Sequence, residues 1–184
     1  MLSKLIRGAV NCLRIFFIRI RCGRKVSIYP IQPMRVRSQL MIQKSVTGVT
    51  IGKNFKLETD AKVRVVEKGT LTVGDNCFIN CGSYLTVMGN TKIGDGCLIG
   101  PNVMIFDHDH DYKCAGGIAA GQSVVGDIVI GNNVWIGANS VILKGTVIGD
   151  NSVIAAGSIV KGSVPENSMV YQKRDNVLKC IRRD

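Results

Sequence analysis

The sequence predicts a solenoid, a fold in which short repeated units stack on one another and share one continuous core. The first observation is a run of apolar residues near the C-terminal end that stand six apart without a break: Ile130, Ile136, Ile142, Ile148, Ile154 and Val160. A period of six matches neither a free strand nor a helix. In a solenoid, each unit turns one apolar side chain inward and buries it by stacking on its neighbours.

The second observation is that the same spacing returns upstream in groups of three. The groups are Ile51, Leu57 and Val63; Val73, Ile79 and Leu85; Ile93, Ile99 and Ile105; and Val124, Ile130 and Ile136. Groups of three predict a three-sided coil with about 18 residues per turn. The extra residues between groups then leave the coil at one corner, and the longest excursion separates Ile105 from Val124.

The third observation concerns the residues between the inward positions. Glycine often follows the inward residue, and Asn and Asp cluster near it, as expected where the chain turns tightly. The position four after the inward residue is mostly small, which lets successive corners stack: Cys77, Ser83, Cys97, Val103, Val134, Ser140, Thr146, Ser152 and Ser158.

Residues 1–45 form a basic, amphipathic segment that we expect to cap the solenoid. Residues 2–20 have helical spacing. Their apolar stripe is Leu2, Leu5, Ile6, Ala9, Val10, Leu13, Phe16, Phe17 and Ile20. We expect this stripe to cover the open end of the coil. The alternative is peripheral membrane contact, with residues 2–20 lying on an anionic lipid surface. The apolar run from Ile15 to Ile18 is too short to span a bilayer.

The positive charge is concentrated in the first third of the chain. Twelve Lys or Arg and no acidic residue precede Glu58, and the remainder carries 12 basic and 13 acidic side chains, so the net charge of +11 arises before Glu58. No recognition motif for nucleic acid accompanies this charge, so we expect no nucleic-acid binding.

Residues 46–165 are the predicted solenoid, and its long loop, residues 106–123, contains both histidines of the chain, His108 and His110. A histidine near its ordinary pKa can take a proton at neutral pH, and a neighbouring carboxylate can orient its ring. The loop therefore predicts a general-base site, against the alternative of a solvated polar loop. Two histidines fall short of the three that a His₃ catalytic zinc site uses, so we expect no metal.

Residues 166–184 form a polar and basic tail, for which we expect a short helix. The seven cysteines are odd in number and contain no Cys-x-x-Cys pair, so they indicate neither a disulfide framework nor a zinc finger. Cys77 and Cys97 occupy the small hexad position and are interpreted as packing residues in a reducing cytoplasm. We expect a cytoplasmic protein, at the inner face of the membrane if its N-terminal helix binds lipid.

The hexads, the loop histidines and the segment 130–161, IGNNVWIGANSVILKGTVIGDNSVIAAGSIVK, resemble the hexapeptide-repeat acyltransferases. Within that family the chain looks most like the bacterial sugar O-acetyltransferases, including the galactoside and maltose enzymes and those that modify surface polysaccharides. The resemblance implies an all-β fold, the left-handed parallel β-helix. It also implies homotrimers with active sites between neighbouring prisms, and acetyl-CoA as co-substrate.

The resemblance assigns candidate site residues as well. It places His110 on the catalytic position, where the imidazole removes a proton from the acceptor hydroxyl as that oxygen attacks the thioester. A slip of two residues in the loop would exchange it with His108. Asn80 matches the family Asn near the acceptor and the acetyl group. The residues that carry over as contacts with acetyl-CoA are Trp135, Ala138, Ala156 and Lys161. After the final Pro the chain departs from the family pattern, with residues 170–173 in place of Ala-Gly-Asn-Pro, and the candidate phosphate partners there are Lys179 and Arg183.

The function that this resemblance implies is acetyl transfer from acetyl-CoA to a sugar hydroxyl, in surface polysaccharide or glycolipid biosynthesis. Transfer is expected to be direct, with a histidine as general base. Two alternatives stay open. One is transfer to the amine of a nucleotide-linked amino sugar, and the other is a trimeric scaffold without catalytic activity.

Overall fold

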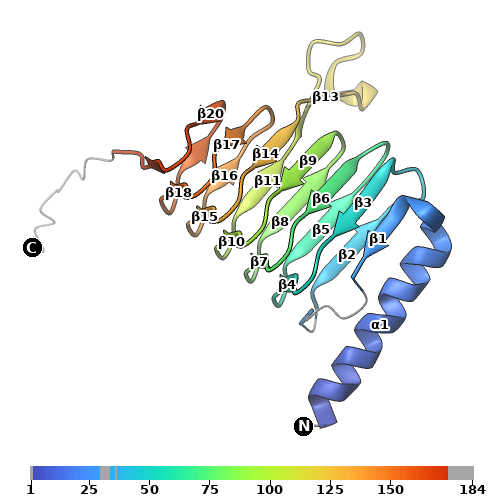
Figure 1. The fold of residues 1–184 in the computed structure, drawn as a ribbon. Helices are drawn as coiled ribbons and strands as arrows, with labels where there is room; N and C mark the ends of the chain where they lie inside the picture. The colour runs from blue at the N-terminus through green and yellow to red at the C-terminus, as the bar shows by residue number, and fades with distance from the viewer. Residues whose placement is uncertain (1, 30–33, 36, 174–184) are drawn as a thin grey trace, which may run out of the picture.

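The computed structural model describes residues 2–29, 34–35 and 37–173, with side chains from residue 8 onward, and shows a three-sided β-solenoid (Figure 1). We name its three parallel sheets face A, face B and face C. Face A contains β1 (Val26–Ile28), β3 (Gly48–Ile51), β6 (Thr70–Val73), β9 (Asn90–Ile93), β14 (Ile128–Ile130), β17 (Val147–Ile148) and β20 (Ser163–Val164). Face B contains β4 (Lys56–Leu57), β7 (Phe78–Ile79), β10 (Leu98–Ile99), β15 (Trp135–Ile136), β18 (Val153–Ile154) and β21 (Met169–Val170). Face C contains β2 (Gln39–Ile42), β5 (Lys62–Val65), β8 (Tyr84–Val87), β11 (Met104–Phe106), β16 (Val141–Ile142) and β19 (Ile159–Val160).

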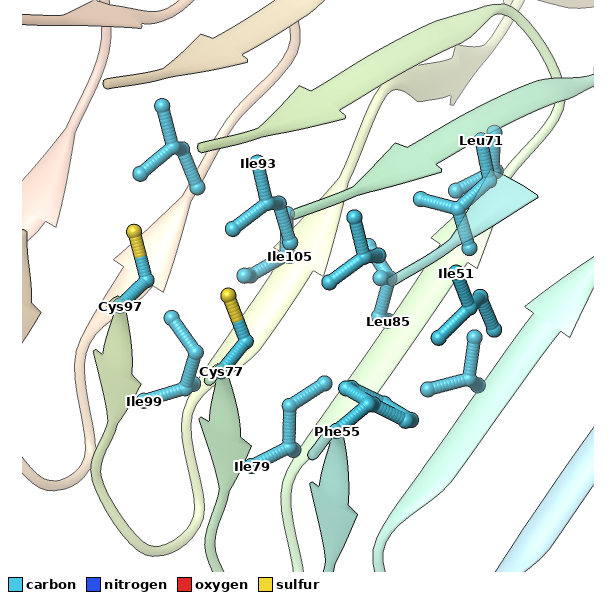
Figure 2. Close-up of a cluster of buried hydrophobic side chains, with 14 of the residues drawn as sticks. Ile51, Phe55, Leu71, Cys77, Ile79, Leu85, Ile93, Cys97, Ile99 and Ile105 are labelled. Atoms are coloured by element: carbon cyan, nitrogen blue, oxygen red, sulfur yellow. The ribbon is translucent and has the colours of Figure 1, made fainter. Parts of the chain in front are cut away.

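The inward residues of successive turns are aligned with one another. On face B, for example, Ile79, Ile99, Ile136 and Ile154 are paired in register from strand to strand. These side chains are buried, and Figure 2 shows the resulting core of aliphatic side chains and cysteines inside the coil. Full burial of one such side chain contributes roughly 1.5 to 3 kcal/mol, so stacked rows stabilise a narrow prism. The predicted solenoid is confirmed.

One predicted inward position is wrong. Val124 is 43% exposed and lies in β13 (Ser123–Val125), outside the coil. The residue that continues face A after Ile93 is Ile130. Val124 stands six residues before Ile130 by coincidence, because the chain re-enters the coil only at Ile128. The excursion therefore covers residues 107–127, and it leaves at the corner between faces C and A, as do the two shorter insertions.

The turns between faces A and B explain the Asn pattern. At this corner, residues with positive φ repeat from turn to turn: Asn54, Asn76, Asn133, Asn151 and Asn167. Asn tolerates this left-handed conformation better than most side chains. The amide of Asn151 accepts a hydrogen bond from Asn133 and donates one to Asn167, both at 3.3 Å, so the side chains form a ladder along the corner.

The two cysteines at the small hexad position are buried packing residues. Each thiol donates to a backbone carbonyl of the next turn at 3.0 Å, Cys77 to Gly94 and Cys97 to Gly131. The hydrogen bond with Cys77, together with burial, raises the pKa of the Cys97 thiol. That thiol stays protonated, which fits a role in packing.

The N-terminal helix α1 (Leu2–Cys22) packs against the end of the coil, but not through the predicted stripe. The buried side chains from residue 8 onward are Asn11, Ile15, Ile18 and Cys22. The stripe residues Val10, Leu13, Phe16, Phe17 and Ile20 are 45 to 65% exposed. The end of the coil is a narrow surface, so a four-residue seam is enough to cover it. Helix α1 therefore lies against the end of the coil through this seam, whereas these described residues of the predicted stripe face away from it.

The strands extend beyond both predicted limits of the solenoid. β1 and β2 precede residue 46, and β21 follows residue 165 and pairs with β18. The expected helical tail falls mostly on residues 174–184, outside the described residues, and so do Lys179 and Arg183. Among the described residues, no helix is both long enough and apolar enough to cross a bilayer.

Candidate active site

Two carboxylates fix the base of the long loop to the turn before it. Asp107, fully buried, accepts hydrogen bonds from the backbone N–H groups of Met88 and Gly89, both at 2.9 Å. Its Oδ2 also accepts from the hydroxyl of Thr91 at 3.2 Å. At the other end of the loop, Asp127 accepts from the N–H of Asn90 at 3.3 Å. Both ends of the loop are therefore anchored at one corner of the prism.

Asp107 also orients an imidazole. Its Oδ1 lies 3.1 Å from Nδ1 of His108, whose side chain is 18% exposed. Because this carboxylate already accepts from two N–H groups and a hydroxyl, it is an acceptor toward the ring as well. Nδ1 therefore carries the proton of the neutral ring, and Nε2 is left as the basic nitrogen.

Aromatic contacts hold His108 from the other side. Its ring meets Phe106 edge to face at 6.3 Å between centroids, and Phe106 meets Tyr84 in the same manner at 5.9 Å. A hydrogen bond with Thr86, followed by a hydrogen bond with Arg64 and the charge of Arg64, lowers the pKa of Tyr84. The row of rings runs along the outer side of face C and ends at the loop.

His110 lies on the same short strand, β12 (His108–His110), which pairs antiparallel with β13. Residues two apart on a strand point to the same side, so both imidazoles leave one face of this ribbon. His110 is exposed, and its ring forms no hydrogen bond or ion pair within the part of the chain that the structure describes. Between the two, Asp109 is held by Lys144, with 3.4 Å from Nζ to Oδ2.

The tip of the loop projects away from the prism (Figure 1). It contains the short 3₁₀ helix η2 (Gly117–Ala120) and exposes Tyr112 and Ile118. The Cys114 thiol donates to backbone carbonyls within this tip, to Asp111 at 3.1 Å and Gly117 at 3.3 Å, and so has a structural role.

Other predicted site residues gather at the corner between faces B and C. Asn80, Ala138 and Ala156 follow β7, β15 and β18 there. Asn80 Oδ1 accepts from the N–H of Cys81 at 2.8 Å. Among the hydrogen bonds of the described residues, none uses the N–H groups of Ala138 and Ala156. These two backbone N–H groups belong to residues with small side chains, so they could donate hydrogen bonds to the amide carbonyls of a pantetheine arm. Trp135, 52% exposed on face B, lies beside this corner.

One chain does not bring the two groups together. The histidines and Lys161 are at the corner between faces C and A, whereas Asn80, Ala138 and Ala156 are at the corner between faces B and C. The whole width of face C separates them. A site that uses both groups therefore needs a loop from one chain and a corner from another.

Sequence reasoning underrated three residues of this site. Asp107 and Asp127 anchor the loop, and Lys144 holds the ribbon through Asp109 and the carbonyl of Val124. The Asp next to His108 was a visible signal for ring orientation. Asp127 and its partner Asn90 are 37 residues apart in the sequence, and Lys144 and its partner Val124 are 20 apart. Spacing alone could therefore not identify these contacts.

Comparison with known proteins gives a consistent result. Residues 70–107 and 127–162 match the family model described as bacterial transferase hexapeptide (six repeats), and the two matched blocks flank the loop. The chain is 29% identical over 131 residues to the lipopolysaccharide biosynthesis O-acetyl transferase WbbJ of Escherichia coli, covering 67% of each protein. It is 37% identical over 120 residues to the galactoside O-acetyltransferase of Escherichia coli, covering 64% of this chain and 57% of that enzyme.

A solved structure shares the fold. A variant of AntD, an N-acyltransferase from Bacillus cereus, in complex with dTDP and coenzyme A, superimposes with a TM-score of 0.69 at 17% identity. The match covers 91% of this chain and 89% of that one. At this identity the likeness concerns the fold alone.

Proposed function

Because the chain belongs to the bacterial transferase hexapeptide family, we propose that it transfers the acetyl group of acetyl-CoA to a hydroxyl group of a sugar acceptor. The observation that carries the proposal is the oriented imidazole of His108 on a loop anchored at the corner of the prism. The names of the two Escherichia coli relatives support a hydroxyl acceptor, and that of WbbJ supports a place in surface glycan assembly.

The reaction needs a group that takes a proton from the acceptor and later returns it, and an imidazole on the loop can do both. As the acceptor oxygen bonds to the thioester carbonyl carbon, its proton passes to an unprotonated imidazole nitrogen, and the bond from carbon to sulfur breaks. The imidazolium then returns the proton to the departing thiolate. A positioned base of this kind contributes about a hundred- to ten-thousand-fold in rate. Holding the acceptor, the thioester and the imidazole together lowers the entropic part of the barrier further.

Geometry and resemblance point to different histidines for this role. His108 has its tautomer fixed by Asp107 and presents Nε2, whereas His110 occupies the position that the resemblance gives to the base. Since both side chains leave the same face of the ribbon, either could meet an acceptor there. We favour His108 on the geometry of the isolated chain.

The separation of the two corners supports a homotrimer with active sites between neighbouring chains. The loop of one chain would reach the corner of the next that holds Asn80, Ala138 and Ala156, and Trp135 and Lys161 would line the path of the acetyl-CoA arm and phosphates. The exposed apolar tip of the loop, with Ile118, suits contact with a neighbour. Closed cyclic assembly is the common way to repeat such a site.

Release of the CoA thiol measures turnover directly. We expect acetyl-CoA and a sugar acceptor to give thiol release, and the matched amino sugar to give less. His108→Ala should lower kcat about a hundred- to ten-thousand-fold. Asp109→Asn on the same strand is the control: its amide oxygen can still accept a hydrogen bond from Lys144, so the ribbon keeps this contact and kcat should change by no more than about twofold.

The outcomes separate the candidates. Loss with His110→Ala and full activity with His108→Ala would assign the base to His110. Full activity of both variants would overturn the histidine mechanism. A preference for the amine acceptor would favour N-acetyl transfer, and no binding of acetyl-CoA at millimolar concentration would favour the scaffold.

A further inference from the structure

Helix α1 has two apolar sides, and only one of them is used by the fold. The inner seam contains Ile15 and Ile18, and the Asn11 amide in the same seam donates to the carbonyl of Met34 at 2.9 Å. Three arginines add hydrogen bonds to the coil, from Arg14 to Ser38 O, from Arg19 to Ile28 O and from Arg21 to Ile42 O. The helix is thereby held in one orientation on the end of the prism (Figure 1).

The outer side of the same helix is an exposed apolar face. We call this the outer face of α1 and define it as Val10, Leu13, Phe16, Phe17 and Ile20. At 100° per residue these positions cluster opposite the inner seam. Leaving five large apolar side chains together in water is unusual for a surface that has no partner.

Basic side chains surround this face. A groove of about 1050 Å³ runs between α1 and the first strands of face C, and Phe17 and Ile20 form part of its wall. Its basic lining residues are Arg14, Arg21, Lys44 and Arg64. No acidic residue lines the groove, and none occurs in the chain before Glu58.

We propose that the outer face of α1 and this groove dock the protein on an anionic membrane surface. The apolar side chains would enter the boundary between headgroups and acyl chains, while the flanking arginines and lysine meet lipid phosphates. The helix would lie in the plane of the membrane, since it is too polar to cross it.

Charge decides between a membrane and a second copy of the chain. Packing α1 of one copy against α1 of another would bring two strongly basic surfaces together. The nearest acidic residues in the sequence, Glu58 and Asp60, are already paired with Arg35 and Arg37. An anionic bilayer supplies the opposite charge along the whole face, so it is the occupant that this surface fits.

The test is flotation of the full chain with liposomes. We expect binding to vesicles of phosphatidylcholine containing phosphatidylglycerol, and at least about tenfold less binding to phosphatidylcholine alone or at high salt. The double variant Phe16→Gln/Phe17→Gln should reduce flotation by at least about tenfold without changing the melting temperature, since both rings are exposed. Val147→Gln, an exposed apolar position on face A, is the matched control and should float as the unmodified chain does.

Failure of the unmodified chain to float, or full flotation of the double variant, would overturn the proposal. Light scattering completes the test, because a smaller assembly for the double variant would assign the outer face of α1 to contact between copies. The proposal is independent of the transfer reaction. Acetylation of a water-soluble sugar should be the same for the double variant and the unmodified chain.

Discussion

At the scale of single residues, Asp107 connects the fold to the chemistry. The same carboxylate fixes the turn at Met88 and Gly89 and sets the tautomer of His108. A buried carboxylate can accept from several N–H and O–H donors at once, whereas a neutral amide in its place cannot accept from all of them. Positioning of the imidazole is thus a by-product of anchoring the loop.

Asp107→Asn tests this connection. One oxygen becomes an amide NH₂ that faces donors, so we expect a loss of about 1 to 3 kcal/mol in the free energy of unfolding. Because the tautomer of His108 is no longer fixed, the kcat of the variant should also fall by about tenfold or more, and its pH profile should change. Urea unfolding and a pH series measure the two effects. An unchanged pH profile would show that His108 is not the titrating base.

At the scale of elements, the corners explain why this sequence needs its glycines. A Cβ on Gly137 would lie 2.5 Å from the backbone nitrogen of Ala156 in the next turn. Backbone atoms of stacked turns cannot move aside as a flexible side chain can. The close stacking that excludes a methyl group at Gly137 also places the backbones of Ala138 and Ala156 one above the other.

Gly137→Ala should therefore lower the free energy of unfolding by about 1 to 3 kcal/mol, through steric strain in a packed region. Gly8→Ala is the control, because a Cβ there meets nothing within 4 Å and Ala favours a helix. Chemical denaturation should show a lower midpoint for Gly137→Ala and an equal or higher one for Gly8→Ala. Equal midpoints for all three proteins would contradict this account of the corner.

At the scale of the whole molecule, the proposed site residues are distributed over two corners, so the proposed mechanism makes activity a property of the assembly. The histidines and Asn80 are on opposite edges of face C in one chain, and a rigid prism cannot bend to join them. A cyclic arrangement brings unlike edges of neighbouring chains together.

Mixed assemblies test whether the site is shared. One variant carries His108→Ala with His110→Ala, and the other carries Asn80→Ala with Trp135→Ala; each alone should be inactive. After co-expression at equal levels, about one quarter of the sites in random cyclic trimers should combine an intact loop with an intact corner. We expect activity to return to that extent. No recovery would place the complete site within one chain.

Much of the molecule could be predicted from the sequence. The hexads specified the three faces and the corner from which the loop emerges, and the small residues specified the tight stacking inside. Prediction failed where local spacing has no unique meaning. Val124 fits the period but lies in a hairpin, and the apolar stripe of α1 looked like a capping surface although Ile15, Ile18 and Asn11 cap instead.

The sequence by itself determined the repeating unit, because burial of one apolar side chain every six residues depends only on local spacing and on stacking between identical units. It also determined that both histidines lie on one projecting loop. Only the tertiary structure decided that Asp107 holds His108, that the remaining site residues lie across face C, and that the outer face of α1 is exposed. Each of these depends on distances between residues far apart in the chain or on which of two faces is covered, and no local period encodes them.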